Sequence, residues 1–550
     1  MEKKYISESR YKKTTREKAN REKKGVKLKK KKKLKRKTKK LIRQVIILVI
    51  IILVAINIYN NEKTKNAEEK NYVKTETGEL KPINYSSINI GINVENKTIA
   101  PITTKNLYIA ELNKYLYRFL VKIDKEYNIK YDVLKDIEKI SNKEYILSIK
   151  DNIKYDLDRE ISIHDVKNSI EQLKTLGKST IYYDNVKNIK EIVVLENKKI
   201  KIILKEENLL FIYDLSFPIL PIRKYNDKTK ILQDFAPQEL GNIYNVYQND
   251  QSLIYERSKY SSRAYLQKIN IEKRKSTETL ISDFKENKIN AFFTTSKNIE
   301  NDLGKYEYDK RYIPTGQSVF MFGNSKSSKF ANKDVRIALS YLINKQEIKK
   351  EVYKNMCVGI DIPYINYNIK YRYDKIAAKN ILTSGGFEKK SGIYTKDKIV
   401  LSFRLLVNIN NPELYKISKI IKNTMAENGI RIEIIEVDNY SYANFLNRGD
   451  YDLALMEVNL NENVNISFLD RFIYPSNDLK TINIKLSKEK KSKEIIKLFK
   501  EKMKIMQDEA LCIGIISQTS CLISEKSLKG LEDIAYMNIF SDLQNIYLTK

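Results

Sequence analysis

The residue types that carry most enzyme and metal chemistry are scarce in this chain. Its 550 residues include one His, three Cys and no Trp. Any Ser–His–Asp or Cys–His mechanism would have to use His164, which falls in a predicted helix-capping turn and is expected to be an ordinary surface residue. These counts exclude a His-based metal cage, a zinc ribbon and a cysteine-rich scaffold. We therefore predict no catalytic residue, no metal site and no cofactor.

The cysteines and acidic residues do not define a reactive site either. Cys512 and Cys521 flank the apolar run 513–516 and could pair outside the cell. Buried free thiols are the simpler expectation, and we expect Cys357 to be a packing residue. Asp and Glu are abundant, but no pair of them is marked as an acid/base dyad. We predict that the protein is not an enzyme.

Charge is concentrated at the start of the chain. The whole chain has 102 Lys/Arg and 69 Asp/Glu, a net charge of +33, and residues 1–44 alone hold 22 Lys/Arg and 4 Asp/Glu. The surplus in the rest is diffuse, which is a poor signal for nucleic acid. The 38 Tyr could stack on bases, but they are dispersed through apolar strands, where core and rim positions are expected. We expect no nucleic-acid partner.

A membrane segment is predicted directly after this basic tail. No charged residue interrupts the 18 residues from Gln44 to Asn61. The apolar stretch 45–59 would span about 22 Å as a helix, and Leu41, Ile42 and a snorkelling Arg43 can extend it toward the roughly 30 Å of a bilayer core. Because it is apolar all round, it does not resemble an amphipathic core helix.

The charge asymmetry predicts the orientation of this segment. The basic tail 1–44 would be cytoplasmic, 45–59 a retained single-pass signal anchor, and 60–82 a polar tether that holds an extracellular body at the cell membrane. A cleaved signal peptide is the alternative, although Ala55 is the only small residue near a cleavage position.

From residue 83 onward, strand and helix patterns alternate, which indicates an α/β fold. We predict strands at Ser87–Val94, Glu144–Ile149, Glu191–Leu195, Ile200–Leu204, Ile399–Leu406, Arg431–Val437 and Leu453–Met456. We predict helices at Leu107–Phe119, Ile163–Lys174, Ser276–Glu286, Val335–Ile343, Tyr373–Ser384, Pro412–Asn428, Ser441–Asn447 and Glu489–Asp508.

Several of these segments carry motifs in a recognisable order. Residues 154–166 match "K-F-H-D-G-x-x-L-T-A-x-D-V" without a gap, and Ser162 and Asp165 have the spacing of a capping box. Residues 334–345 are similar to "D-x-R-V-R-x-A-L-x-Y-A-I-D-R", and 373–387 to "Y-D-P-x-x-A-K-x-L-L-x-x-A-G-Y". Residues 449–452 match "G-D-F-D". Together they resemble the extracytoplasmic substrate-binding proteins of oligopeptide and dipeptide ABC importers, family 5.

The resemblance implies a two-lobed, periplasmic-binding-protein-like clamp of type II, with an extra subdomain in lobe one. Lobe one would cover 83–264, with the subdomain at about 110–180. Lobe two would cover 265–508, and 509–550 would return to lobe one. Such clamps hold a ligand between the lobes and close by a hinge motion.

The family's ligand-binding positions can be carried over by register from Asp452. Phe468 and Leu469 keep the family spacing, so the family's Trp position is Val458 and its acidic position, which pairs with a peptide's ammonium group, is Asn461. Because this charge is missing, the identity of the ligand is in doubt. Glu457 or Glu462 could supply the negative charge in its place. The ligand-binding residues implied by the resemblance are Thr103, Asn324, Asn408, Glu457, Val458, Asn459, Asn461 and Glu462.

The function implied is capture of a peptide or peptide-like ligand for an ABC permease by a membrane-tethered, monomeric receptor. The alternative is a surface sensor or structural partner that uses the same clamp without transport.

Overall fold

The computed structural model describes residues 72–74, 80–82, 87–93, 106–154, 160–196, 198–220, 244–248, 252–257, 265–460, 464–532, 534–540 and 543–549. The chain forms two compact units, Met1–Ile83 and Asn84–Lys550. In the first unit, β1 (Tyr72–Lys74) pairs antiparallel with β2 (Leu80–Pro82). No helix in the described ranges is long and apolar enough to cross a membrane. The predicted anchor at 45–59 and the tail 1–44 lie outside those ranges.

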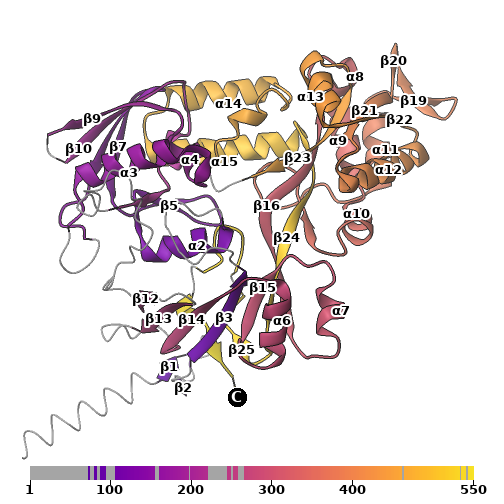
Figure 1. Cartoon of the computed structure of the whole chain (residues 1–550). Helices are drawn as coiled ribbons and strands as arrows, with labels where there is room; N and C mark the ends of the chain where they lie inside the picture. The colour runs from indigo at the N-terminus through magenta and orange to yellow at the C-terminus, as the bar shows by residue number, and fades with distance from the viewer. Residues whose placement is uncertain are drawn as a thin grey trace, which may run out of the picture. The chain divides into compact units, whose positions relative to one another are not determined.

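The second unit is built on one large mixed sheet (Figure 1). Its main path runs through β12 (Tyr244–Gln248), β13 (Ser252–Arg257), β14 (Lys268–Arg274), β3 (Ser87–Asn93), β15 (Ala291–Thr294), β24 (Ile513–Ser524), β16 (Asp309–Gly323), β23 (Leu453–Asn459), β21 (Ser402–Asn408) and β22 (Arg431–Val437). A short strand, β17 (Cys357–Gly359), pairs with β24 off this path. The α/β class predicted from the alternating patterns is confirmed.

Two separate core clusters lie under helices at the two ends of this sheet, and a third, larger cluster includes residues of both ends, among them Ile90 of β3 and Val458 of β23. At one end, called the β3 half, α6 (Thr277–Lys285) and α7 (Ile299–Leu303) cover a core that includes Leu280, Phe292 and Cys521. At the other, called the β21 half, the core gathers side chains from α9 (Lys333–Tyr341), α10 (Lys345–Glu351), α11 (Lys375–Ser384) and α12 (Pro412–Glu427). Among the strands in the described ranges, β16 and β24 alone run through both halves.

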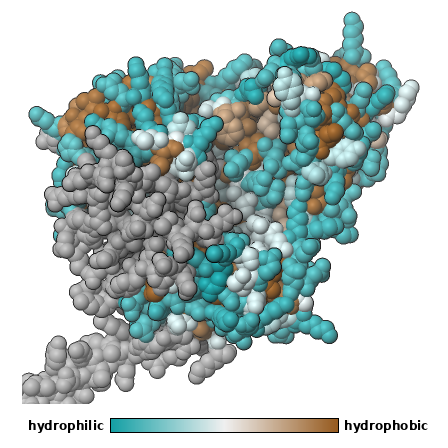
Figure 2. Space-filling model, in the orientation of Figure 1, coloured by the Kyte–Doolittle hydropathy of each residue, from teal (hydrophilic) through white to brown (hydrophobic). Residues whose placement is uncertain are grey.

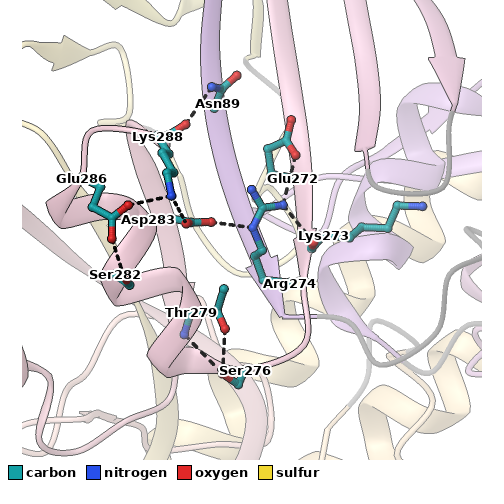
Figure 3. Close-up of polar contacts among 10 residues, drawn as sticks. All are labelled: Asn89, Glu272, Lys273, Arg274, Ser276, Thr279, Ser282, Asp283, Glu286 and Lys288. Atoms are coloured by element: carbon teal, nitrogen blue, oxygen red, sulfur yellow. Dashed lines mark hydrogen bonds and ion pairs between the residues drawn. The ribbon is translucent and has the colours of Figure 1, made fainter.

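The α6 helix of the β3 half is fixed by a charged network (Figure 3). Ser276 caps the helix by accepting a hydrogen bond from the backbone N–H of Thr279. Arg274, at the end of β14, donates from Nε to Asp283 at 2.6 Å and from Nη1 to Glu272 at 3.1 Å. Because Asp283 is on α6 and Arg274 on β14, this pair holds the helix against the sheet.

A smaller antiparallel sheet lies between β3 and β12 in the chain, with the order β7 (Leu134–Ser141), β8 (Glu144–Ile149), β10 (Lys199–Leu204) and β9 (Ile189–Leu195). Figure 2 shows hydrophobic atoms gathered over it among hydrophilic ones. Its helix α3 (Ile163–Leu176) begins with the predicted capping box, in which Ser162 and Asp165 each accept a hydrogen bond from the other's backbone N–H. His164 is exposed on this helix, as expected.

The helices α14 (Asn477–Lys488) and α15 (Ser492–Asp508) pack against the region of this smaller sheet. The ring of Phe499 on α15 lies 6.3 Å from that of Tyr127 and 5.0 Å from that of Tyr213. The other elements are α2 (Leu107–Leu116), β4 (Arg118–Phe119), β5 (Val121–Ile123), β6 (Ile129–Tyr131), α4 (Tyr183–Val186), α5 (Phe211–Asp214), β11 (Pro218–Ile219), α8 (Ser328–Ala331), β18 (Glu388–Lys390), β19 (Ile393–Lys396), β20 (Ile399–Val400), α13 (Asn439–Arg448), β25 (Leu528–Lys529) and β26 (Tyr547–Leu548).

Two predicted elements are wrong in extent. The helix predicted over Leu107–Phe119 ends at Leu116, because Phe119 joins β4, where it pairs with Pro218 and donates its backbone N–H to Asp132. The single strand predicted over Ile399–Leu406 is two strands, since β20 belongs to a three-stranded sheet with β18 and β19, whereas β21 belongs to the main sheet. The predicted lobe boundaries remain predictions.

All three cysteines are free and buried. Cys512 and Cys521 stand at the start and within β24, so about 30 Å of extended chain separates them and a disulfide is sterically impossible. Burial raises the pKa of Cys357 and of Cys521 to about 12. The prediction of buried free thiols is confirmed.

A wide bulge lies where β16 passes from one half to the other. Pro314 pairs with Thr519 and Ser318 with Ser517, so three residues of β16 face one of β24. Gly316, in the bulge, has φ +95 and accepts a hydrogen bond at 2.9 Å from the backbone N–H of Leu460. A Cβ on Gly316 would lie 2.1 Å from the Leu460 carbonyl oxygen. Only glycine fits this conformation and this contact.

We predict that Gly316→Ala lowers the free energy of unfolding by about 3 kcal/mol or more, since backbone strain near 1–2 kcal/mol adds to a clash with main-chain atoms. Gly392→Ala is the matched control: Gly392 has φ +84, but a Cβ there would contact nothing within 4 Å. It should lose only the strain contribution. Equal losses for the two variants in chemical denaturation would show that the bulge contact is unimportant.

Candidate ligand-binding site

The β21 half contains a change of chain direction that commonly creates a binding site. β21 pairs in parallel with both β22 and β23. Helix α12 connects β21 to β22 and packs on the core of the β21 half. Helix α13 connects β22 to β23, and its Tyr442 and Phe445 pack on the opposite face of the sheet. In open α/β sheets, ligands bind at the carboxyl ends of the strands beside such a switch point. The loops after β21, β22 and β23 are therefore the candidate site.

Asparagine side chains link two of these loops. Asn408, the last residue of β21, donates from Nδ2 to Oδ1 of Asn439, which begins α13, at 2.6 Å. Asn410 accepts at its Oδ1 from the backbone N–H of Asn439 at 3.0 Å. Ile409 and Tyr440 beside them are 45% and 79% exposed, so the loops present apolar surface as well as amides. Such a surface can contact both the polar and the apolar parts of a ligand.

A carboxylate held by amides lies at the end of β23. Glu457 accepts from Gln317 of the β16 bulge at 2.8 Å, from Gln518 of β24 at 3.3 Å and from Asn411 at 3.4 Å. Asn411 also caps α12 by accepting from the N–H of Leu414. Among the described residues, no Lys or Arg lies within 4.0 Å of this carboxylate. Glu457 therefore offers a negative charge to a ligand.

Further carboxylates keep this edge negative. Hydrogen bonds from Ser441, chiefly from its backbone N–H at 2.8 Å, hold the pKa of Asp438 below its usual range. The Lys297 ammonium group lowers the pKa of Glu413 in the first turn of α12. Both groups sit at helix N-termini, where a negative charge is favoured. The part of the chain that the structure describes holds no cluster of three or more His, Cys, Asp or Glu arranged for a metal ion.

The residues predicted from the sequence separate into three sets. Asn408 ends β21, and Glu457 and Asn459 lie at the end of the neighbouring parallel strand β23. Val458 follows Glu457 but points to the other face of β23, where it is 5% exposed in the core. Thr103, Asn461 and Glu462 lie outside the described residues.

Asn324 is not part of this group. Its Nδ2 donates to the carbonyl oxygens of Gly449 and Tyr451 at 2.8 and 2.9 Å, and it follows Gly323, the partner of Leu453 at the opposite end of β23. About 13 Å of strand separates that end from Glu457. Asn324 thus connects β16 to the turn before β23.

The site also contains polar residues that were not predicted, among them Gln317, Asn411, Gln518 and Asn439. The Asn411-Pro-Glu sequence is a helix-start signal, and it correctly predicted the beginning of α12. Neither glutamine carries any signal, because 201 residues separate them and only the β16–β24 pairing brings them together.

The fold is that of an α/β protein with a candidate ligand site at the carboxyl ends of parallel strands. A model of bacterial extracellular solute-binding proteins, family 5 (middle region), matches residues 129–480. The chain belongs to that family, and the family resemblance predicted from the motifs is confirmed.

Individual relatives differ in what their names describe. The nickel-binding protein NikA of Staphylococcus aureus is 23% identical over 369 residues, which are 64% of this chain and 70% of that protein. The structure is similar to the unliganded open form of the murein tripeptide-binding protein MppA, with a TM-score of 0.62, 16% identity, and coverage of 85% of this chain and 98% of MppA. It is also similar to a nickel ABC transporter structure from Bacillus halodurans, with a TM-score of 0.62, 16% identity, and coverage of 84% and 98%. At these identities the solved structures support the fold alone.

Proposed function

We propose that this chain captures a peptide or peptide-like solute outside the cell and delivers it to an ABC permease. The observation that carries the proposal is the position of Asn408, Asn411, Glu457 and Asn459 at or just after the ends of β21 and β23, beside the switch point of a family 5 chain, with Asn411 bonded to Glu457. Amides can bond a peptide backbone, and a carboxylate without a cationic neighbour among the described residues can pair with a cationic group of the ligand.

The proposal is tested with the body from Glu62 to Lys550, purified after export. Because a ligand that binds only the folded state raises Tm, we expect a shift with a peptide pool, together with a peptide-like molecule in mass spectra of the material that co-purifies. Ni²⁺, amines and sugars are tested in parallel, since relatives are named for different ligands. A rise in Tm with Ni²⁺ and with no peptide would show that the ligand is a metal ion and not a peptide. No shift with any library would favour the sensor or structural-partner alternative.

The identity of residue 461 predicts a further property of the ligand. The register from Asp452 places Asn461 where family members hold an ammonium group with an acid. Asn keeps an acceptor oxygen without the charge, and charge-assisted hydrogen bonds are about twice as strong as neutral ones. We therefore expect weak binding of free-amino peptides, and a preference for ligands whose amine is blocked or bound elsewhere.

Asn461→Asp should strengthen binding of free-amino peptides and leave N-acetylated ones unchanged or weaker, as measured by titration calorimetry on matched peptides. Losing a desolvated charge pair commonly costs about 2 to 5 kcal/mol, so the gain should be tenfold or more. Glu457→Gln and Glu462→Gln are the comparison variants. If the parent protein binds free-amino peptides tightly and one of these two variants loses that binding, the carboxylate replaced in that variant is the one that pairs with the ammonium group.

We also propose that 45–59 anchors the protein in the cell membrane with residues 1–44 in the cytoplasm, on the strength of the basic block before the uncharged run. Protease added to intact cells should remove the body and spare an N-terminal tag. A body that stays protected would reverse the orientation, and a mature N-terminus just after Ala55 would replace the anchor with a cleaved signal peptide.

A further inference from the structure

One lysine of the β3 half contacts the β21 half. Lys297 lies in the connection between β15 and α7, and its Nζ is 3.0 Å from Oε1 of Glu413 in the first turn of α12. The same Nζ lies 5.3 Å from the centre of the Tyr353 ring, which belongs to the core of the β21 half. The two side chains of the ion pair are 37% and 34% exposed.

Tyr353 presents a ring, and not a charge, to this lysine. The side chain is fully buried, its hydroxyl has no hydrogen-bond partner among the described residues, and burial raises its pKa far above the usual range. The ring thus stays neutral and can attract the ammonium group through its face. Lys297 is held by one charge and one ring, both from the other half.

This contact lies where it can affect the distance between the two halves. The two helix-covered cores are separate, although a third core cluster includes Ile90 of β3 as well as Phe322 of β16 and Val458 of β23. Among the described strands, β16 and β24 are the ones that run through both halves, with the Gly316 bulge between their two paired stretches. A rotation at the bulge would change the distance from the β15–α7 connection to α12. Glu413 is also two residues from Asn411, which bonds Glu457 in the candidate site.

We propose that Lys297 and Glu413 form a latch that sets how far the two halves stand apart, and so sets the affinity of the site. Neither residue needs to touch the ligand, so both are positioning residues. The link to affinity rests on the proposed function, but the distance between the halves can be measured without any ligand.

The test is a distance distribution from paired spin labels in the full body. Labels go on Cys introduced at Asn301 of α7 and Asn423 of α12, which are exposed, while the three native thiols are buried. Lys297→Met should shift the ratio of short to long distances by roughly two- to five-fold, the range expected for a partly exposed ion pair. Glu413→Gln should give the same shift. The double variant Lys297→Glu with Glu413→Lys should restore the parent distribution.

Lys310→Met is the matched control. Lys310 also forms an ion pair, with Glu300, and lies 5.9 Å from the Tyr312 ring centre, but Glu300 belongs to α7 of the β3 half and Tyr312 to β16 where it pairs with β24 beside β15. Lys349 of α10 lies 5.7 Å from the same ring, and Lys310→Met leaves that contact between the halves in place. This control variant should leave the distances unchanged. The latch is refuted if Lys297→Met and Glu413→Gln leave the distribution at the parent values, or if Lys310→Met shifts it equally. An altered distribution with no ligand found would refute the proposed solute and keep the latch.

Discussion

The pairing of β16 with β24 is the constraint on which the rest of the second unit depends. Residues 309–314 of β16 pair with the same part of β24 that holds β15, and residues 318–321 pair with the part that holds β17. One antiparallel pair therefore supports both halves. The bulge between its two paired stretches bends the ladder and places Gln317 and Gln518 at the end of β23, where both reach Glu457.

The site follows from this pairing together with the parallel strands of the β21 half. β21 and β23 end at the same edge because they run in parallel, and the helices α12 and α13 leave that edge open because they cover opposite faces. Amides and carboxylates collect there because helix N-termini need acceptors, which Asn411 and Asp438 supply. The same local rules that start the helices therefore build a polar edge.

Much of the fold was predictable, because local signals and tertiary packing agree. The capping box at Ser162, the Asn-Pro-Glu start of α12 and the alternation in β22 each led to the correct element. β16 was not predicted, since Pro314 and Gly316 in its centre argue against a strand. The pairing of β16 with β23 begins only at Gln317, so Pro314 has a neighbouring strand, β24, on one side only. On its open side, the missing N–H of Pro314 removes no hydrogen bond.

By itself, the sequence determined the family, the α/β class, the exposed His164 and the free buried thiols, and it named three residues of the candidate site, Asn408, Glu457 and Asn459, whose role in binding stays a prediction. All of these depend on residue type, on counts or on spacing within one segment. Tertiary structure alone decided that Asn324 belongs to the far end of β23, that Val458 faces the core, and that Gln317, Gln518 and Lys297 approach the carboxylates. The reason is physical: these placements depend on strand register and on contacts between residues 61 to 140 positions apart, and no local pattern encodes either.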